Sequence, residues 1–264
     1  RSLNGPAYFR GALYVQRGNS TTSGDSPQII SLSSRNGTQN WATNFAAQGY
    51  EYLPPTVTED AVYINGGYYG GMYAFGRETG NQIFFNSNLE QYHKWTPSVY
   101  NNKVYSFVNG KLNQHHLTTG VIEWTVDVKL ETSSYDMDRA VAIAAGAAFA
   151  TNYRYGGNEL VCIDLSTQTV RWRVQTGFTG TPSVSGSRVY AYDTSGNVKS
   201  FDVNSGILQR TYTTGIGSGG LYQPIITNDV LIASSSSGTA IHDLTTGTKI
   251  QSIAAGGIPS LSNG

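Results

Sequence analysis

A repeat of about 42 residues recurs along the chain and restricts the possible folds more than any other feature of the sequence. Each repeat starts with an apolar stretch that is opened by proline, or once by valine, at Pro6, Pro55, Pro97, Val141, Pro182, Pro224 and Pro259. Eight residues after the first six starts, a large side chain lies within a short apolar run, at Tyr14, Tyr63, Tyr105, Phe149, Tyr190 and Ile232. This regularity indicates one supersecondary unit copied along the chain.

A tight turn and a following large residue mark the second half of each repeat. The turns are Arg35-Asn36-Gly37, Glu78-Thr79-Gly80, Thr118-Thr119-Gly120, Ser166-Thr167-Gln168, Asn204-Ser205-Gly206 and Thr245-Thr246-Gly247. Glycine or a tolerant polar residue at the third place suits a backbone with positive φ. Four residues past the turns stand Trp41, Phe84, Trp124, Trp172, Arg210 and Gln251. Each repeat is therefore predicted to form four strands.

Four-stranded repeats cannot bury their faces singly, so the pattern predicts an all-β fold, a β-propeller of six blades. The alternatives are an ordinary β-sandwich with accidental spacing and a fragment of a seven- or eight-bladed propeller. We expect one domain over residues 1–264, with repeats starting near residues 6, 55, 97, 141, 182 and 224 and an extra strand over 258–263. Because the chain opens with Arg1 and lacks the apolar core of a signal peptide, we expect a processed product or a cut fragment.

Charge and hydropathy exclude several classes of partner. Lys plus Arg and Asp plus Glu each number 17, so the formal net charge is 0. Nucleic acids and anionic membranes both require a basic surplus, and we expect neither as a partner. The sequence has no apolar run that approaches the roughly 20 residues of a membrane-spanning helix. We expect a monomer or a weak oligomer, because a near-neutral chain has little charge repulsion against self-association.

The ends of the repeats resemble those of a known family. The segments from Ile163 to Trp172 and from His116 to Trp124 are similar to the Asp-x-x-Thr-Gly-x-x-x-Trp signature of quinoprotein-like β-propellers, also called PQQ repeats. The resemblance covers nearly the whole chain and implies that Trp41, Trp124 and Trp172 are structural residues that dock on a neighbouring blade. The family includes quinone-dependent dehydrogenases, outer-membrane assembly scaffolds of the BamB type, and extracellular sensor or binding domains, so the fold alone does not define a function.

The enzymes of that family carry a vicinal pair of cysteines beside the quinone and a bound calcium. This chain has a single cysteine, Cys162, so that disulfide cannot form, and we expect no quinone and no other cofactor. Asp136 and Asp138 are spaced as in some calcium loops, but no Asp-x-Asp-x-Asp-Gly run follows them. We therefore expect no metal site. The resemblance is to the members that are not dehydrogenases.

A polar residue can be compared with the residues at the same position of the other repeats, and one that replaces an apolar residue is predicted to be structural. His115 and His242 occupy positions that other repeats fill with Phe75, Ile163 and Phe201, and His116 takes the place of an aspartate. These three histidines are predicted to be structural. His93 is the histidine outside the register.

The loops that lead into the first strand and those that join the second and third strands share one face of a propeller. In repeats two to four, these loops are rich in aromatic and charged residues, whereas in repeats five and six they are small. Exposed Tyr and Trp suit sugar rings or a protein hot spot. The predicted ligand-binding residues are Glu51, Tyr52, Tyr68, Tyr69, Lys94, Trp95, Asp136, Asp138, Tyr153, Tyr155 and Tyr222. The alternative is that these loops only pack on one another.

These loops leave three functions open. The first is a secreted, extracellular or periplasmic module that binds a glycan or a protein segment. The second is a carbohydrate-active enzyme, such as a lyase on an acidic polysaccharide, with catalytic residues His93, Tyr92, Arg139 and Arg154. A glycosidase pair of Glu51 with Asp136 or Asp138 is a variant of this hypothesis. The third is a protein-assembly scaffold or sensor.

Overall fold

The described part of the computed structural model consists of strands and their connections. It covers residues 5–17, 26–46, 54–66, 70–90, 95–130, 140–155, 157–175, 177–219 and 223–259. The chain divides into two compact units, residues 1–140 and residues 141–264. Three four-stranded antiparallel sheets fall in each unit. A search of the described residues finds no helix with the length and hydropathy of a membrane span.

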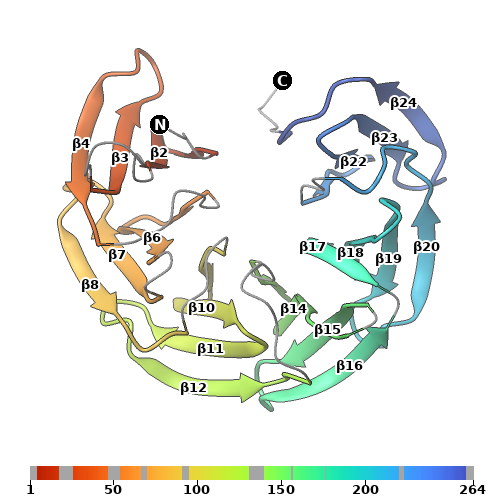
Figure 1. Cartoon of the computed structure of the whole chain (residues 1–264), viewed down its shortest axis with the longest axis horizontal. Helices are drawn as coiled ribbons and strands as arrows, with labels where there is room; N and C mark the ends of the chain where they lie inside the picture. The colour runs from red at the N-terminus through yellow and green to blue at the C-terminus, as the bar shows by residue number, and fades with distance from the viewer. Residues whose placement is uncertain are drawn as a thin grey trace. The chain divides into compact units, whose positions relative to one another are not determined.

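The first compact unit contains sheets 1 to 3. Sheet 1 comprises β1 (Ala7–Phe9), β2 (Ala12–Arg17), β3 (Gln28–Ser33) and β4 (Gln39–Asn44). Sheet 2 comprises β5 (Thr56–Val57), β6 (Ala61–Asn65), β7 (Met72–Gly76) and β8 (Gln82–Asn86). Sheet 3 comprises β9 (Ser98–Tyr100), β10 (Lys103–Val108), β11 (Lys111–His116) and β12 (Ile122–Asp127). Within this unit, the last strands β4, β8 and β12 lie along one side, and β2, β6 and β10 lie along the other (Figure 1).

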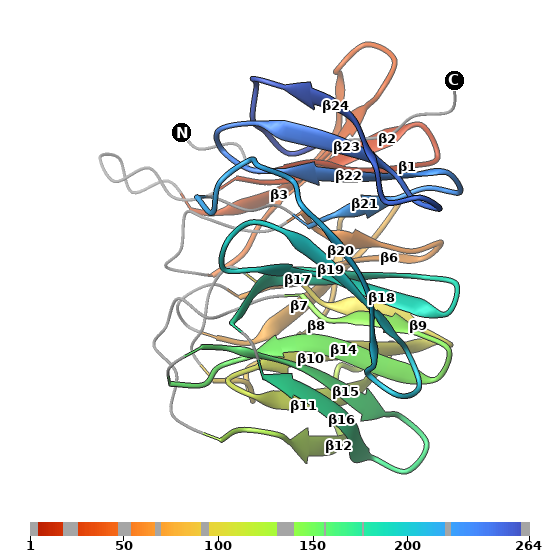
Figure 2. The same cartoon turned by 90° about the vertical axis from the view of Figure 1, so that its right-hand side faces the viewer.

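The second compact unit contains sheets 4 to 6. Sheet 4 comprises β13 (Ala142–Ala144), β14 (Ala147–Asn152), β15 (Glu159–Asp164) and β16 (Thr169–Gln175). Sheet 5 comprises β17 (Phe178–Ser185), β18 (Arg188–Asp193), β19 (Val198–Asp202) and β20 (Leu208–Tyr212). Sheet 6 comprises β21 (Ile225–Ile226), β22 (Val230–Ser234), β23 (Thr239–Asp243) and β24 (Lys249–Ile253). Figure 2 shows these three sheets stacked on one another.

The repeat positions of the sequence meet across the strands in every sheet. The residue eight places after each start lies opposite the third strand, which in turn pairs with the residue four places past the turn. The resulting rows are Tyr14–Ser31–Trp41, Tyr63–Ala74–Phe84, Tyr105–Gln114–Trp124, Phe149–Cys162–Trp172, Tyr190–Ser200–Arg210 and Ile232–Ile241–Gln251. One register irregularity follows the middle residue of each row. The predicted repeat of four strands is therefore confirmed at the level of single residues.

The hydrophobic core lies between successive sheets within each compact unit. Tyr14 and Ile29 of sheet 1 pack with Val62 and Phe75 of sheet 2. Similar clusters join sheets 2 and 3, sheets 4 and 5, and sheets 5 and 6. Because burial of apolar area contributes about 25 cal/mol per Å², packing on the neighbouring sheet stabilises each sheet.

The predicted turns have the backbone that their sequence requires. The third turn residues, Gly37, Gly80, Gly120, Gln168, Gly206 and Gly247, all have positive φ. In sheet 5, Asp202 Oδ1 accepts hydrogen bonds from the backbone N–H of Asn204 and Ser205, at 3.0 and 2.9 Å. These bonds, with the one from the Ser205 hydroxyl, hold the pKa of the Asp202 carboxyl below its usual value. In sheet 6, whose turn reads Asp-x-x-Thr-Gly, Asp243 Oδ1 likewise accepts from the Thr246 backbone N–H at 2.6 Å and from its hydroxyl at 2.9 Å, so the pattern is a capped turn.

Two of the three tryptophans past the turns, Trp41 and Trp172, dock on the next sheet, as the resemblance implies. Trp41 Nε1 donates a hydrogen bond to the Arg77 carbonyl of sheet 2 at 2.9 Å. Trp172 Nε1 donates to the Val203 carbonyl of sheet 5 at 3.0 Å. A Cβ atom built at Gly80 would lie 2.6 Å from two ring carbons of Trp41, so the indole covers that turn directly.

Strand bounds differ from the predicted repeat starts in sheet 5. Five first strands begin one residue after the predicted start, but β17 begins at Phe178, four residues before Pro182. The pairing with β18 is irregular between Thr179 and Ser183. Proline has no N–H to donate, so it lies within a strand only where the ladder is interrupted. At the C-terminal end, Ile258 and Pro259 lie outside any strand, and the rest of the expected strand 258–263 falls outside the described residues.

We predict that Gly80→Ala destabilises the chain more than Gly37→Ala. Both glycines have positive φ, which costs an alanine about 1–2 kcal/mol. The new Cβ would meet nothing within 4 Å at Gly37, whereas at Gly80 it would meet Trp41, and overpacking adds about 1–3 kcal/mol. Urea unfolding of the two variants measures the difference. Equal losses of stability would show that the Trp41 dock contributes nothing beyond the turn itself.

Candidate interaction face

Four of the predicted site residues lie within the described part of the chain, namely Trp95, Tyr153, Arg154 and Tyr155. The other predicted residues fall outside it, namely Glu51, Tyr52, Tyr68, Tyr69, Tyr92, His93, Lys94, Asp136, Asp138, Arg139 and Tyr222. Their roles in ligand binding or catalysis stay predictions.

Trp95 is in the interior, which corrects the prediction of an exposed aromatic platform. Its side chain is 1% exposed and packs with Tyr63, Phe84 and Val104 in the cluster between sheets 2 and 3. The Trp95 carbonyl accepts a hydrogen bond from Asn65 Nδ2. An indole buries a large apolar area, and the junction between two sheets offers more of it than the surface does. Trp95→Ala is therefore expected to destabilise the first compact unit.

The segment Tyr153–Tyr155 presents the exposed part of the candidate face. It follows β14, and the Tyr155 side chain is 83% exposed, whereas Tyr153 and Arg154 are half-buried. Asn158 anchors the segment, because its Nδ2 donates to the Phe178 carbonyl at 3.1 Å while the Phe178 N–H donates to the Asn158 carbonyl at 2.9 Å. Tyr155 is thus carried on a loop fixed to sheet 5.

A buried charge beneath this loop was missed by the sequence analysis. Glu159, the first residue of β15, is fully buried, and its Oε1 accepts hydrogen bonds from Asn152 Nδ2 at 2.8 Å and from Arg173. Glu159 Oε2 has no partner among the described residues. A buried carboxylate requires a cation and hydrogen bonds. Strand register places Gln28 of sheet 1 and Lys111 of sheet 3 at the position of Glu159, so no apolar contrast between repeats marks this pair in the sequence.

His115 and Ser106 have the contacts of a nucleophile–base pair, but a substrate cannot reach them. Its Nε2 lies 2.9 Å from Ser106 Oγ, and its Nδ1 lies 3.0 Å from the Gly120 carbonyl oxygen. The carbonyl can only accept, so Nδ1 carries the proton and Nε2 accepts from Ser106. Both side chains are fully buried, and the partner that orients the ring is the turn of its own sheet. The pair is structural, in agreement with the prediction for His115.

His242 repeats half of this arrangement in sheet 6. Its Nδ1 lies 3.2 Å from the Gly247 carbonyl oxygen, but Nε2 has no partner among the described residues. The place of Ser106 is taken by Ala233, and Tyr212 packs edge-on against the imidazole at 5.7 Å. Burial lowers the pKa of both His115 and His242.

We predict that His115 makes the folded state lose stability in mild acid. Because burial lowers the pKa of His115 below its ordinary value of 6.5, the unfolded chain takes up this proton at a higher pH than the folded chain does. The contribution is present above pH 6.5 and is lost as the pH falls, by up to about 1.4 kcal/mol per pH unit. His115→Phe introduces the residue that sheets 2 and 5 have at this position, Phe75 and Phe201. The free energy of unfolding, measured with urea, should then change less between about pH 7 and 5.

The exposed neighbour provides the control. His116→Gln removes the exposed imidazole next to His115 and controls for the loss of a histidine at this strand end. An unaltered slope in His115→Phe, or an equal change in both variants, would contradict the assignment.

Cofactor chemistry of the quinone type does not fit the residues present. Cys162 is fully buried in β15, opposite Phe149 and Trp172, and its thiol contacts the Val203 carbonyl at 3.9 Å. Burial raises the pKa of this thiol to about 12. It is therefore a core residue with no second cysteine beside it in the sequence. Among the described residues, no three His, Cys, Asp or Glu side chains are grouped as a metal site would require.

Solved structures share this arrangement of sheets. BamB from Moraxella catarrhalis superposes with a TM-score of 0.71 at 17% identity, over 94% of this chain and 74% of that one. The computationally designed Ika8 protein gives 0.68 at 12% identity, over 89% and 68%. The quinohemoprotein alcohol dehydrogenase ADHIIG from Pseudomonas putida HK5 gives 0.62 at 14% identity, and this chain spans 41% of its length. A search of the curated proteins finds no match.

Six four-stranded sheets with the docked-tryptophan repeat define a β-propeller of the PQQ-repeat class, in which each sheet is one blade. The sequence model of the family described as outer membrane protein assembly factor BamB matches residues 2–212 and 108–255. The chain belongs to this family.

Proposed function

We propose that the chain is a noncatalytic scaffold that binds protein partners outside the cytoplasm, in a secreted or periplasmic location. The observation that carries the proposal is the match of nearly the whole chain to a family named for outer membrane protein assembly. The structural likeness to BamB supports it at the level of the fold. Of the three functions left open by the sequence, the family match favours the scaffold.

The loop after β14 supports this reading physically. Tyr and Arg are the residues most often found at protein hot spots, and Tyr155 and Arg154 lie side by side in this segment. Asn158, which precedes β15, is tied to Phe178 of sheet 5 by two hydrogen bonds. The ion pair of Glu159 and Arg173 beneath it stiffens the same strand end.

The other two functions have narrower support. Glycan binding rests on the aromatic composition of the loops, and Trp95 no longer contributes an exposed ring to it. The lyase hypothesis rests on His93, Tyr92 and Arg139, which fall outside the described residues, and on Arg154, which is half-buried. Incubation with uronate polysaccharides and absorbance near 235 nm tests the lyase hypothesis directly, because β-elimination leaves a conjugated double bond.

We predict that a photo-crosslinking amino acid at position 155 captures a protein partner and one at position 8 does not. Tyr8 is the matched control, because it is also an exposed tyrosine, at 66%. The crosslinks are made in the organism's own extracytoplasmic fraction and the partner is identified by mass spectrometry. Tyr155→Ala should then weaken binding of the identified partner by about tenfold or more, as for a hot-spot residue, and Tyr8→Ala should not.

Equal labelling from positions 155 and 8, or saturable binding to a glycan array with no protein crosslink, would contradict a protein-binding scaffold and favour the glycan-binding module. Product absorbing near 235 nm would favour the enzyme.

A further inference from the structure

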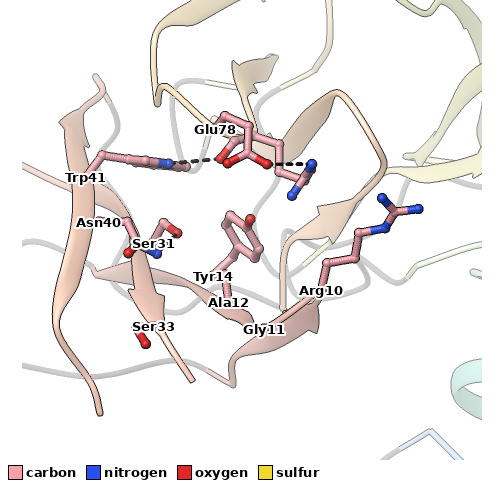
Figure 3. A pocket seen from close by; sticks show the side chains of 10 residues that line it. Arg10, Gly11, Ala12, Tyr14, Ser31, Ser33, Asn40, Trp41 and Glu78 are labelled. Carbon is pink, nitrogen blue, oxygen red and sulfur yellow. Dashed lines mark hydrogen bonds and ion pairs between the residues drawn. The ribbon is translucent and has the colours of Figure 1, made fainter. Parts of the chain in front are cut away.

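A polar cleft lies in the first compact unit, at the end of sheets 1 and 2 that carries the short turns. Its volume is about 250 Å³, and Figure 3 shows the side chains around it. Tyr14, Ser31 and Asn40 come from sheet 1, and Arg77 and Glu78 come from the turn between β7 and β8. Typical small-molecule sites measure about 300–1,000 Å³, so this cleft suits a single side chain or a small anion.

The cleft arises where the repeat is broken. Arg77 stands at the position that other repeats fill with an apolar residue, such as Leu117, Val203 and Leu244. Each of those three packs against the core cluster between its own sheet and the preceding one. The Arg77 side chain instead lies over Phe9 and hydrogen-bonds to the Glu59 carbonyl and to Tyr14, so this junction has a charged group where sister repeats have an apolar one. The fold does not require an arginine at this position, since sister sheets close the junction with apolar side chains.

The Arg77 guanidinium is held in place before any ligand arrives. Its Nε donates to the Glu59 carbonyl at 2.6 Å, and its Cζ lies 5.5 Å from the centre of the Phe9 ring. Burial lowers its pKa, but the hydrogen bond with the Tyr14 hydroxyl and the charges of Glu78 and Glu59 outweigh burial and raise the pKa overall. The Arg77 side chain is only 13% exposed. A fixed guanidinium binds an anion without the entropic cost of ordering a long side chain.

The Arg77 guanidinium already binds one carboxylate, that of Glu78. Its Oε1 lies 2.6 Å from Arg77 Nη2, and the Glu78 side chain is 75% exposed (Figure 3). An ion pair with one partner so exposed contributes little to stability. The carboxylate of Glu78 can therefore leave Arg77 at low cost and be replaced by a carboxylate from outside. Arg10, at the rim, is paired with Glu59 at 2.6 Å and adds a second cation near the opening.

We propose that this cleft binds a carboxylate group, with Arg77 as the binding residue and Glu78 as an internal competitor that occupies the site when no ligand is bound. The planar guanidinium matches a carboxylate through paired hydrogen bonds. The hydroxyls of Tyr14 and Ser31 and the amide of Asn40 supply further polar groups in the lining. The carboxylate comes from an acidic side chain or from a chain terminus. The site is separate from the loop of Tyr155 and does not rest on the proposed scaffold function.

Nuclear magnetic resonance titration tests the proposal on the whole chain. The probes are N-acetyl-glutamate methylamide, which has a side-chain carboxylate, N-acetyl-glycine, which has a terminal one, and N-acetyl-glutamine methylamide, which is neutral. The Arg77 Nε–Hε resonance and the Gly11 backbone amide, which lines the cleft, should shift saturably with at least one acid and not with the neutral amide. The stronger of the two acids identifies the source of the carboxylate.

Two variants with opposite effects complete the test. Arg77→Leu introduces the residue that sheet 3 has at the equivalent position, Leu117. It should keep the fold and abolish the shift at Gly11. Glu78→Gln should tighten binding by about two- to fivefold, because it removes the competitor. Arg35→Ala, which removes an exposed arginine outside the cleft, should change nothing. Absence of saturation, equal shifts with the neutral probe, or unchanged binding in both Arg77→Leu and Glu78→Gln would overturn the proposal. If Arg77→Leu does not fold, Glu78→Gln and the probe series decide alone.

Discussion

In each compact unit, a tryptophan in the fourth strand of one sheet packs on the turn between the third and fourth strands of the next sheet, and this contact fixes how the two sheets are spaced. Trp41 lies flat on the turn at Gly80 and donates to the Arg77 carbonyl, and Trp172 does the same at Gly206 and Val203. Each dock needs two things at once, a large ring four residues past one turn and a bare, positive-φ backbone in the next. Because both lie at fixed places in the repeat, the dock sets the spacing between sheets and leaves apolar faces such as those of Tyr14 and Phe75 in contact.

This coupling explains why the fold could be predicted from the sequence. A docked ring, a positive-φ turn and a proline-led strand each require particular residue types, and they recur at fixed offsets. The exceptions have local causes: Pro182 lies inside β17 because the ladder is irregular there, and Gln168 adopts a positive φ in place of glycine. Sister repeats also identified His115 and His242 as structural, since the equivalent residues Phe75, Ile163 and Phe201 are apolar and buried.

The candidate site was less predictable, for a reason that is also physical. Residue type does not show whether a loop aromatic points outward or inward, and Trp95 is more stable inside the junction of sheets 2 and 3 than on its surface. The pair of Glu159 and Arg173 is formed by residues 14 apart whose contact depends on strand register. Arg77 could have been found from the sequence, because it departs from an apolar position of the repeat.

The connection of strands within each sheet has a consequence for how the chain folds. In all six sheets, every strand pairs with the strand next to it in sequence. Loop-closure entropy is therefore small, and the contact order within a sheet is low for an all-β protein. Each sheet can nucleate as a local meander and then gain its stability when the following sheet docks on it. Folding can accompany synthesis, one sheet at a time, and duplication of a single sheet-length gene segment would extend the array without a new topology.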